Sequence, residues 1–189
     1  MDVQYLRSMQ HVSPSIVRIA TMEDYPEITR LFLQYHNESA HFSLDYKKID
    51  WIVARLLNPE IIARDDIGTR GVMGVIGPVG ALEGVVAVII STPWYSSQRV
   101  LNDLALYVDP HYRASSHAKA MIEWMKEQSR VTNIPLISGV VATERTEAKV
   151  RLFRRQMPVK MGEYFYYDPK SSIVTSSGVG IEGHQMAGA

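Results

Sequence analysis

The residues best suited to chemistry lie where a predicted strand turns into a predicted helix, between Leu104 and Arg130. The small polar run Ala114-Ser115-Ser116 comes directly before the helix, between Arg113 and Lys119. The first N–H groups of a helix have no partner inside it, and the helix dipole favours negative charge there. This pattern predicts a phosphate-sized anion site and a nucleotide-like ligand. The alternative is an ordinary strand–turn–helix in which a serine caps the helix and nothing is bound.

Two residue patterns indicate the strand and the helix that lie on either side of this turn. The preceding strand alternates, with one face formed by Leu104, Leu106 and Val108 and the other by Ala105, Tyr107 and Asp109. Asp109-Pro110 ends that strand. The following helix carries a core-facing stripe at helical spacing: Ala118, Met121, Ile122 and Met125.

The other elements are predicted from the same patterns. A capping box at Thr21–Asp24, with Pro26 in the first turn, opens one helix, and Asp45 precedes another. Further strands are predicted at Ser15–Ala20, Val72–Ile76, Ala81–Ile90, Val100–Asp109, Leu136–Ala142 and Val159–Asp168, and a last helix at Glu144–Gln156. This order indicates an α+β fold, a three-layer α/β arrangement. Its central sheet is mixed and mostly antiparallel, with one parallel crossover and helices on both faces.

Composition limits the functional classes. The 189 residues are 46% hydrophobic, which is enough for one globular domain, expected over 15–168 with an arm at 1–14 and a flexible tail at 169–189. A net charge of zero argues against nucleic-acid binding, and no apolar run is long enough for a membrane span. There is no cysteine, no metal-ligand spacing and no signal-peptide pattern, so a cytoplasmic, metal-free protein is expected.

The chain from about Ile16 to Asp168 resembles the GNAT superfamily of N-acetyltransferases. That family has a strand followed by a V-x-P-x-x-R-G-x-G-x-G/A turn and a helix. Val108, Pro110, Arg113 and Ala118 match this turn, while Ala114 and Ser116 replace glycines. The opening VRIATMEDYPEITRLF is similar to the family's first strand and helix, and the Ser-containing turn with GEYFYYDP resembles acetyltransferase-like proteins of phage genomes.

The resemblance implies acetyl-CoA as co-substrate. Its pyrophosphate would lie on backbone N–H groups of the turn, with Arg113 as a helping cation. The edge of strand Leu104–Val108 would pair with the pantetheine arm. The acetyl group would sit where that strand splays from Leu136–Ala142. The implied cofactor residues are Leu106, Val108, Tyr112, Arg113, Ala114, Ser115, Ser116, His117 and Ala118, with the Val108 N–H polarising the thioester carbonyl. Replacing glycines strains the turn only where a positive φ is needed.

The resemblance also exposes a departure. The family often protonates the leaving thiolate with a tyrosine in an Asn…Leu-Tyr pattern, but here the sequence reads Arg151-Leu-Phe153, with Arg145 or Thr146 in the Asn position. Phe153 has no proton to give. Substitutes are the tyrosines of the predicted last strand, above all Tyr166 with Tyr164 and Tyr167, whose alternative role is packing.

Other groups have a functional and a structural interpretation. Glu83 is a candidate base for the amine and Asp103 another, and either could instead be a solvated carboxylate. His36 and His41 flank the predicted acceptor segment, or cap helix carbonyls. The basic helix at Glu144–Gln156 is a 3′-phosphate contact or a solvated face.

Two functions therefore remain from different classes. One is an acetyl-CoA-dependent N-acetyltransferase acting on a small-molecule or protein amine. The other is a non-catalytic GNAT-fold binding or assembly protein, such as a phage structural component. A homo-oligomer is possible through the aromatic last strand.

Overall fold

The computed structural model describes residues 16–39, 42–58, 70–140, 146–157 and 159–162. Its elements in chain order are β1 (Arg18–Ile19), η1 (Met22–Asp24), α2 (Tyr25–Ser39), α3 (Tyr46–Leu57), β2 (Gly71–Ile76), β3 (Gly84–Ser91), β4 (Val100–Val108), η2 (Pro110–Tyr112), α5 (His117–Thr132), β5 (Leu136–Ile137) and α6 (Thr146–Gln156). The predicted arm and tail lie outside the described residues.

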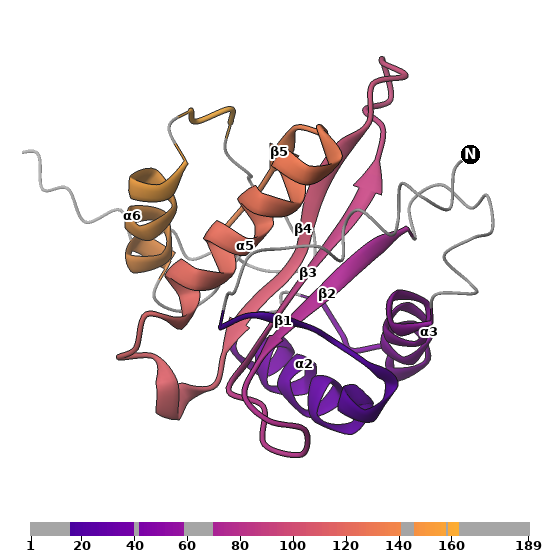
Figure 1. Ribbon diagram of the computed structural model, residues 1–189, viewed down its shortest axis with the longest axis vertical. Helices are drawn as coiled ribbons and strands as arrows, with labels where there is room; N and C mark the ends of the chain where they lie inside the picture. The colour runs from indigo at the N-terminus through magenta and orange to yellow at the C-terminus, as the bar shows by residue number, and fades with distance from the viewer. Residues whose placement is uncertain (1–15, 40–41, 59–69, 141–145, 158, 163–189) are drawn as a thin grey trace, which may run out of the picture.

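A five-stranded sheet, ordered β1-β2-β3-β4-β5, forms the centre (Figure 1). The first four strands pair antiparallel, and β5 pairs parallel to β4 after the crossover through α5. The predicted fold class, a mostly antiparallel mixed sheet with one parallel crossover, is confirmed.

Helices cover both faces of the sheet and create two cores (Figure 1). The α2-side core joins α2 and α3 to the sheet through Ile28, Leu31, Val53, Val85, Ala87, Ala105 and Tyr107. The α5-side core joins α5 to the sheet through Val86, Val88, Leu101, Val108, Met121, Ile122, Trp124 and Met125, with Leu152 and Phe153 of α6 packed against it. Most of β3 is buried because both faces are covered.

Helix starts follow the sequence signals closely. Thr21 and Asp24 form the predicted capping box, in which the Thr21 N–H donates to Asp24 Oδ2 at 2.9 Å. Asp45 accepts from the Lys48 N–H and caps α3. Both helices bury apolar residues in the α2-side core, Ile28, Leu31 and Phe32 from α2 and Val53, Leu56 and Leu57 from α3, so the two predicted helices are confirmed.

Three strand predictions need correction. β1 and β5 have two residues each, shorter than predicted. Residues 159–162 of the predicted last strand lie in no strand, and the exposed side chains of Val159 and Met161 show that no sheet face covers them there. The remainder of that prediction, with Tyr164, Tyr166 and Tyr167, lies outside the described residues.

The side-chain alternation of β4 also differs from the prediction at Leu104. Ala105 pairs with Ala87 and Asp103 with Val88, so β4 carries one extra residue at this point. Such a bulge interrupts the period of two. Leu104 therefore packs with Ala105 and Tyr107 against the α2-side core, instead of sharing a face with Leu106 and Val108.

The β1–β2 pair depends on a close approach at Gly74. A Cβ at this position would lie 2.6 Å from Val17 Cγ1 and 3.1 Å from the Trp124 ring. We expect Gly74→Ala to lower the free energy of unfolding by about 1–3 kcal/mol, because both neighbours are buried and must shift. Urea denaturation measures this, with Gly162→Ala as the control because its Cβ meets nothing within 4 Å. Equal midpoints for the two variants would contradict it.

Candidate active site

The site lies where β4 and β5 separate. β5 pairs with β4 only at Leu101 and Asn102, and beyond these residues the edge of β4 borders a pocket of about 370 Å³. Residues Asn102 to Val108 of β4 form one wall, and Ile137, Gly139 and Val140 form the opposite wall. The predicted gap between splayed strands is therefore present.

The pocket is bordered by elements from both faces of the sheet. Tyr35 and Glu38 of α2 line it, as do Ala148, Lys149, Leu152 and Phe153 of α6. Because α2 packs on one face and α6 belongs to the core on the other, the pocket at the edge of β4 is bordered by both layers of helices.

Beside the pocket, the turn after β4 leads to the start of α5. Ser115 Oγ accepts from the His117 N–H at 3.1 Å, and Ser116 makes no side-chain cap hydrogen bond. The remaining N–H groups of the first turn, including those of Ala118 and Lys119, are thus left for an outside acceptor. Among the described residues, only Asn133 outside glycine has a positive φ. The residues that replace the glycines are therefore free of left-handed backbone strain.

The predicted cofactor residues divide into two groups. Leu106, Val108, Arg113 and Ala118 line the pocket. Tyr112, Ala114, Ser115, Ser116 and His117 form the adjoining turn and the first residue of α5, with the Tyr112 and His117 rings stacked 5.9 Å apart. The predicted strand edge and the turn before α5 therefore lie next to each other, and their role in binding a cofactor stays a prediction.

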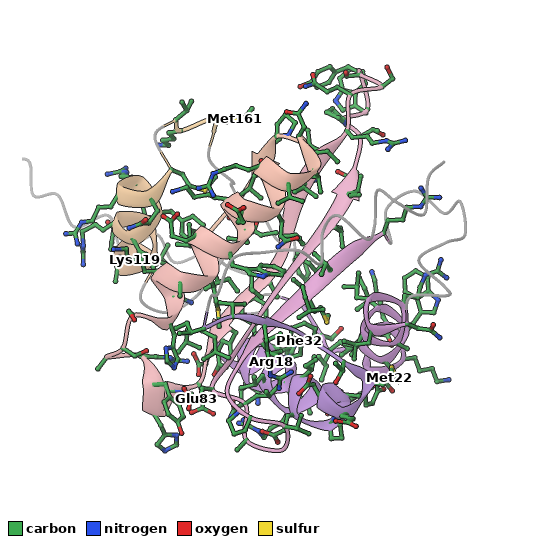
Figure 2. The ribbon with its side chains drawn as sticks, in the orientation of Figure 1. Arg18, Met22, Phe32, Glu83, Lys119 and Met161 are labelled. Carbon is green, nitrogen blue, oxygen red and sulfur yellow. The ribbon has the colours of Figure 1, made fainter. Side chains whose placement is uncertain are left out.

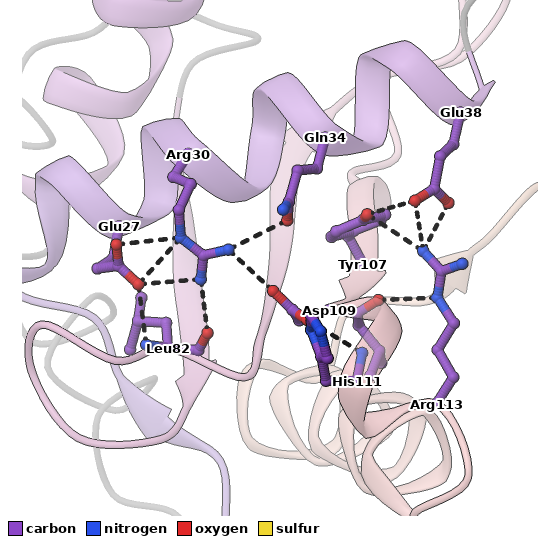
Figure 3. A network of polar contacts seen from close by, with 10 residues as sticks. Glu27, Arg30, Gln34, Glu38, Leu82, Tyr107, Asp109, His111 and Arg113 are labelled. Carbon is purple, nitrogen blue, oxygen red and sulfur yellow. Dashed lines mark hydrogen bonds and ion pairs between the residues drawn. The ribbon is translucent and has the colours of Figure 1, made fainter.

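Arg113 has a different environment from the one expected. Its Nη2 donates to both carboxylate oxygens of Glu38, at 2.7 and 2.5 Å, and its Nε donates to the Val108 carbonyl at 3.1 Å (Figure 3). Nη2 also lies 3.1 Å from the Tyr107 hydroxyl, which donates to Glu38 at 2.7 Å. The guanidinium charge is compensated inside the protein.

Glu83 lies outside the pocket, beside the turn that leads to α5 (Figure 2). Its carboxylate accepts from His117 Nε2 at 2.5 Å, and its carbonyl accepts from the Asp109 N–H. The carboxylate is therefore held away from the β4–β5 gap, where a base would act. This placement gives no support to the prediction that Glu83 is the base for the amine.

Asp103, the second carboxylate considered, lies at the apex of the gap. It follows the last residue of β4 that pairs with β5, and its Oδ1 accepts from the Gly139 N–H at 3.1 Å. Burial raises the pKa of Asp103 above the ordinary value of an aspartate, against hydrogen bonds that lower it. A carboxylate of raised basicity at the edge of a pocket is suited to accepting a proton.

The proton donors of the pocket are tyrosines of α2 and β4. Phe153 does line the pocket and offers no hydroxyl. Burial raises the pKa of Tyr35, with the Asp103 charge adding to it, and burial together with Glu38 raises that of Tyr107. Both hydroxyls consequently keep their protons at neutral pH. Sequence analysis missed Tyr35, Glu38 and Tyr107, because only the three-dimensional packing of α2 brings them to β4.

The remaining candidates have structural roles or lie elsewhere. His36 Nε2 lies 2.8 Å from the Phe42 carbonyl, which belongs to the connection between α2 and α3, so this contact is not the capping of helix carbonyls given as the alternative. Tyr166, His41 and Arg145 lie outside the described residues. Within the described ranges no three His, Asp or Glu side chains gather as a metal site. In the same ranges, none of the helices has the length and apolar character needed to cross a bilayer.

Comparisons with known proteins identify the fold. No family model matches the chain, and no curated protein sequence matches it. Among solved structures, it is similar to a possible acetyltransferase from Clostridium difficile 630, with 18% identity, a TM-score of 0.59, and coverage of 82% of this chain and 96% of that one.

Two further structures have named activities. An aminoglycoside acetyltransferase from an uncultured soil metagenomic sample is 16% identical, with a TM-score of 0.57 over 82% of this chain and 95% of that one. A ribosomal-protein-alanine N-acetyltransferase from Brucella melitensis biovar Abortus 2308 is 16% identical, with a TM-score of 0.54 over 80% and 95%. The sheet with its β4–β5 gap, together with these likenesses, shows that the chain has the fold of the GNAT superfamily acetyltransferases.

Proposed function

We propose that this protein is an acetyl-CoA-dependent N-acetyltransferase that acts on an amine. The observation that carries the proposal is the pocket between β4 and β5, which adjoins a helix start where Ser116 makes no side-chain cap hydrogen bond and contains Asp103 at the apex of the gap. The similar acetyltransferases of known structure support it.

The start of α5 is the proposed holder of the donor's pyrophosphate. Its free N–H groups and the helix dipole attract an anion, and Ala114, Ser115 and Ser116 are small enough to leave them accessible. The edge of β4 at Leu106 and Val108, which no strand covers, would bind the pantetheine amides, apart from the Val108 carbonyl that Arg113 Nε already occupies, and the thioester would lie in the gap. A strand edge offers regularly spaced N–H and C=O groups for this purpose.

Asp103 is the proposed base. A C–N bond forms between the amine and the acetyl carbon, the C–S bond breaks, and the proton lost by the amine goes to Asp103. The thiolate that leaves also needs a proton. The Tyr107 hydroxyl is bound to Glu38, so Tyr35 is the candidate donor among the pocket tyrosines.

The non-catalytic alternative is favoured by one observation. Phe153 occupies the pocket wall where the family's tyrosine would stand, so the protein could hold acyl-CoA without transferring its acetyl group. Binding of acetyl-CoA without release of CoA, either in water or with a panel of primary amines, would select this alternative.

A matched pair of variants at Ser116 tests the donor site. Ser116→Asp places a negative charge at the start of α5, and we expect it to weaken acetyl-CoA binding at least about tenfold. The helix itself should be unharmed, because Asp is as good an N-cap as Ser and suits the helix dipole. Isothermal titration calorimetry with acetyl-CoA and thermal unfolding measure the two effects.

Ser116→Asn is the control, since Asn is a similar cap of nearly the same shape without the charge. It should bind acetyl-CoA about as wild type does. Equal binding by the Asp and Asn variants would show that no phosphate lies at this helix start. Absence of binding by the wild type at millimolar acetyl-CoA would reject the proposed function.

A further inference from the structure

We propose that Arg113 is a positioning residue for the acceptor side of the pocket, and that it does not hold the donor's phosphates. Together with Glu38 and Tyr107 it forms a clasp, named here the α2 clasp, which fixes the C-terminal end of α2 against β4. This inference rests on the proposed function, because it assigns a role within that same site.

The contacts of the α2 clasp use the Nε and Nη2 atoms of the guanidinium. Arg113 makes four hydrogen bonds, two to Glu38, one to Tyr107 and one to the Val108 carbonyl, and its guanidinium carbon lies 5.3 Å from the centre of the Tyr107 ring. The side chains of Arg113 and Glu38 are only 26% and 23% exposed. Moving Arg113 to a phosphate would break both of its hydrogen bonds to the Glu38 carboxylate, whose side chain is largely shielded from solvent.

The direction of the side chain supports the same assignment. Arg113 meets Tyr107 and Glu38, and Tyr107 belongs to the α2-side core. The start of α5 belongs to the opposite core, since Ala118 and Met121 pack against the α5-side cluster. The Arg113 guanidinium therefore points from the turn between β4 and α5 toward α2, away from the face of the sheet that α5 covers.

A second ion pair makes the attachment of α2 directional. Arg30 Nη1 donates to Asp109 at 2.8 Å, and its Nη2 donates to the Leu82 carbonyl (Figure 3). Arg30 and Glu38 lie about two helical turns apart on α2, and both face the segment from Asp109 to Arg113. Along α2 the positive charge comes before the negative one, whereas along this segment the negative charge comes first. A shift of α2 along the turn would bring like charges together, and its register is thereby fixed.

The functional consequence concerns the acceptor. Glu38 and Tyr35, on the last turns of α2, line the pocket on the face opposite α6. If the α2 clasp fixes the positions of Glu38 and Tyr35, it also fixes the width of the pocket on the side where the amine would enter. Loss of the clasp should therefore raise the KM for the amine while leaving the affinity for acetyl-CoA nearly unchanged.

The test compares Arg113→Gln, Glu38→Gln and the double variant with wild type. We expect the Kd for acetyl-CoA to change less than about threefold in each, and amide hydrogen exchange at the end of α2 to become faster in all three. With the primary amine of that panel that gives the fastest release of CoA, we expect the KM for the amine to rise about tenfold in the single variants. The double variant should be no worse than either single one, because the two residues act as a unit.

Arg130→Gln is the matched control, since this arginine is 59% exposed on the outer surface of α5 and does not line the pocket. A tenfold loss of acetyl-CoA affinity in Arg113→Gln, with exchange in α2 unchanged, would overturn the inference while leaving the proposed function intact. Failure of wild type to bind acetyl-CoA would overturn both. Thermal unfolding of each variant shows whether it is folded, and Glu38→Gln, which keeps the side-chain shape, is the variant expected to be disturbed least.

Discussion

Replacement of Asp103 by Asn is expected to reduce the release of CoA from acetyl-CoA by about 10²–10⁴-fold, the usual contribution of a general base. Asn keeps the oxygen that accepts from the Gly139 N–H but cannot take a proton from the amine. The Kd for acetyl-CoA should stay within about twofold, because the side chain lies at the apex of the gap and away from the start of α5. A thiol-reactive dye measures the release, in water alone and with primary amines.

The pH dependence gives this prediction its sign. The base must be ionised, so the wild-type rate should rise with pH through the pKa of Asp103, which burial places above the ordinary aspartate value. That limb should be missing in Asp103→Asn. Because a raised carboxyl pKa means that the ionised form destabilises the folded state, this variant should unfold at the same or a higher temperature than wild type at neutral pH.

Asp50→Asn is the control, since Asp50 lies on α3 outside the pocket and accepts an exposed hydrogen bond from Tyr25. A variant Asp103→Asn that releases CoA at the wild-type rate with the wild-type pH profile would remove Asp103 from the chemistry. A variant that loses both activity and stability would indicate a structural role instead.

The parts of this protein that could be predicted from its sequence depend on neighbours along the chain. The capping box of Thr21 and Asp24 and the Asp45 cap depend on contacts across three residues, and both are present as expected. The stripe of α5 with Met121 and Met125 follows from helical spacing alone. The strand–turn–helix formed by β4, η2 and α5 also belongs to this class, since its parts are contiguous in the chain.

The parts that could not be predicted depend on contacts between distant segments. Arg113 and Glu38 are 75 residues apart, and no spacing rule indicates that they meet. From the sequence alone Arg113 is a candidate cation for a phosphate, whereas in the fold it forms an ion pair with Glu38. The same limit explains Glu83, which as a strand-end carboxylate could have faced the gap but meets His117 of α5 instead.

Leu104 shows a subtler limit. An alternating pattern assigns faces only while the strand is regular, and the extra residue in β4 shifts the assignment by one position. The bulge directly follows Asp103, at the point where β5 leaves β4. The bulge, which interrupts the alternating pattern, thus lies where β4 stops pairing with β5 and begins to line the pocket.

Acid should destabilise this protein through the carboxylates that attach α2 to the sheet and turn, and Asp109 provides the measurable case. Its side chain is 7% exposed, and burial alone would raise its pKa. The hydrogen bonds from Arg30 and His111 outweigh burial and hold the pKa at about 2. Since the folded-state pKa is depressed, the stabilisation is complete above the unfolded value near 4 and is lost as the pH falls to about 2.

The size of this effect is about 2 kcal/mol in the free energy of unfolding, from a pKa difference of nearly two units. Asp109→Asn should therefore be about 2–3 kcal/mol less stable than wild type at pH 7, because Arg30 Nη1 also loses its charged partner. The difference between the two unfolding curves should shrink below pH 4 and nearly vanish at pH 2, where Asp109 of the wild type becomes protonated. Urea denaturation across pH 2–7 measures it, with the exposed Asp50→Asn as the control. A difference that stays constant across this range would mean that the ion pair contributes nothing and that the loss comes from packing at the turn.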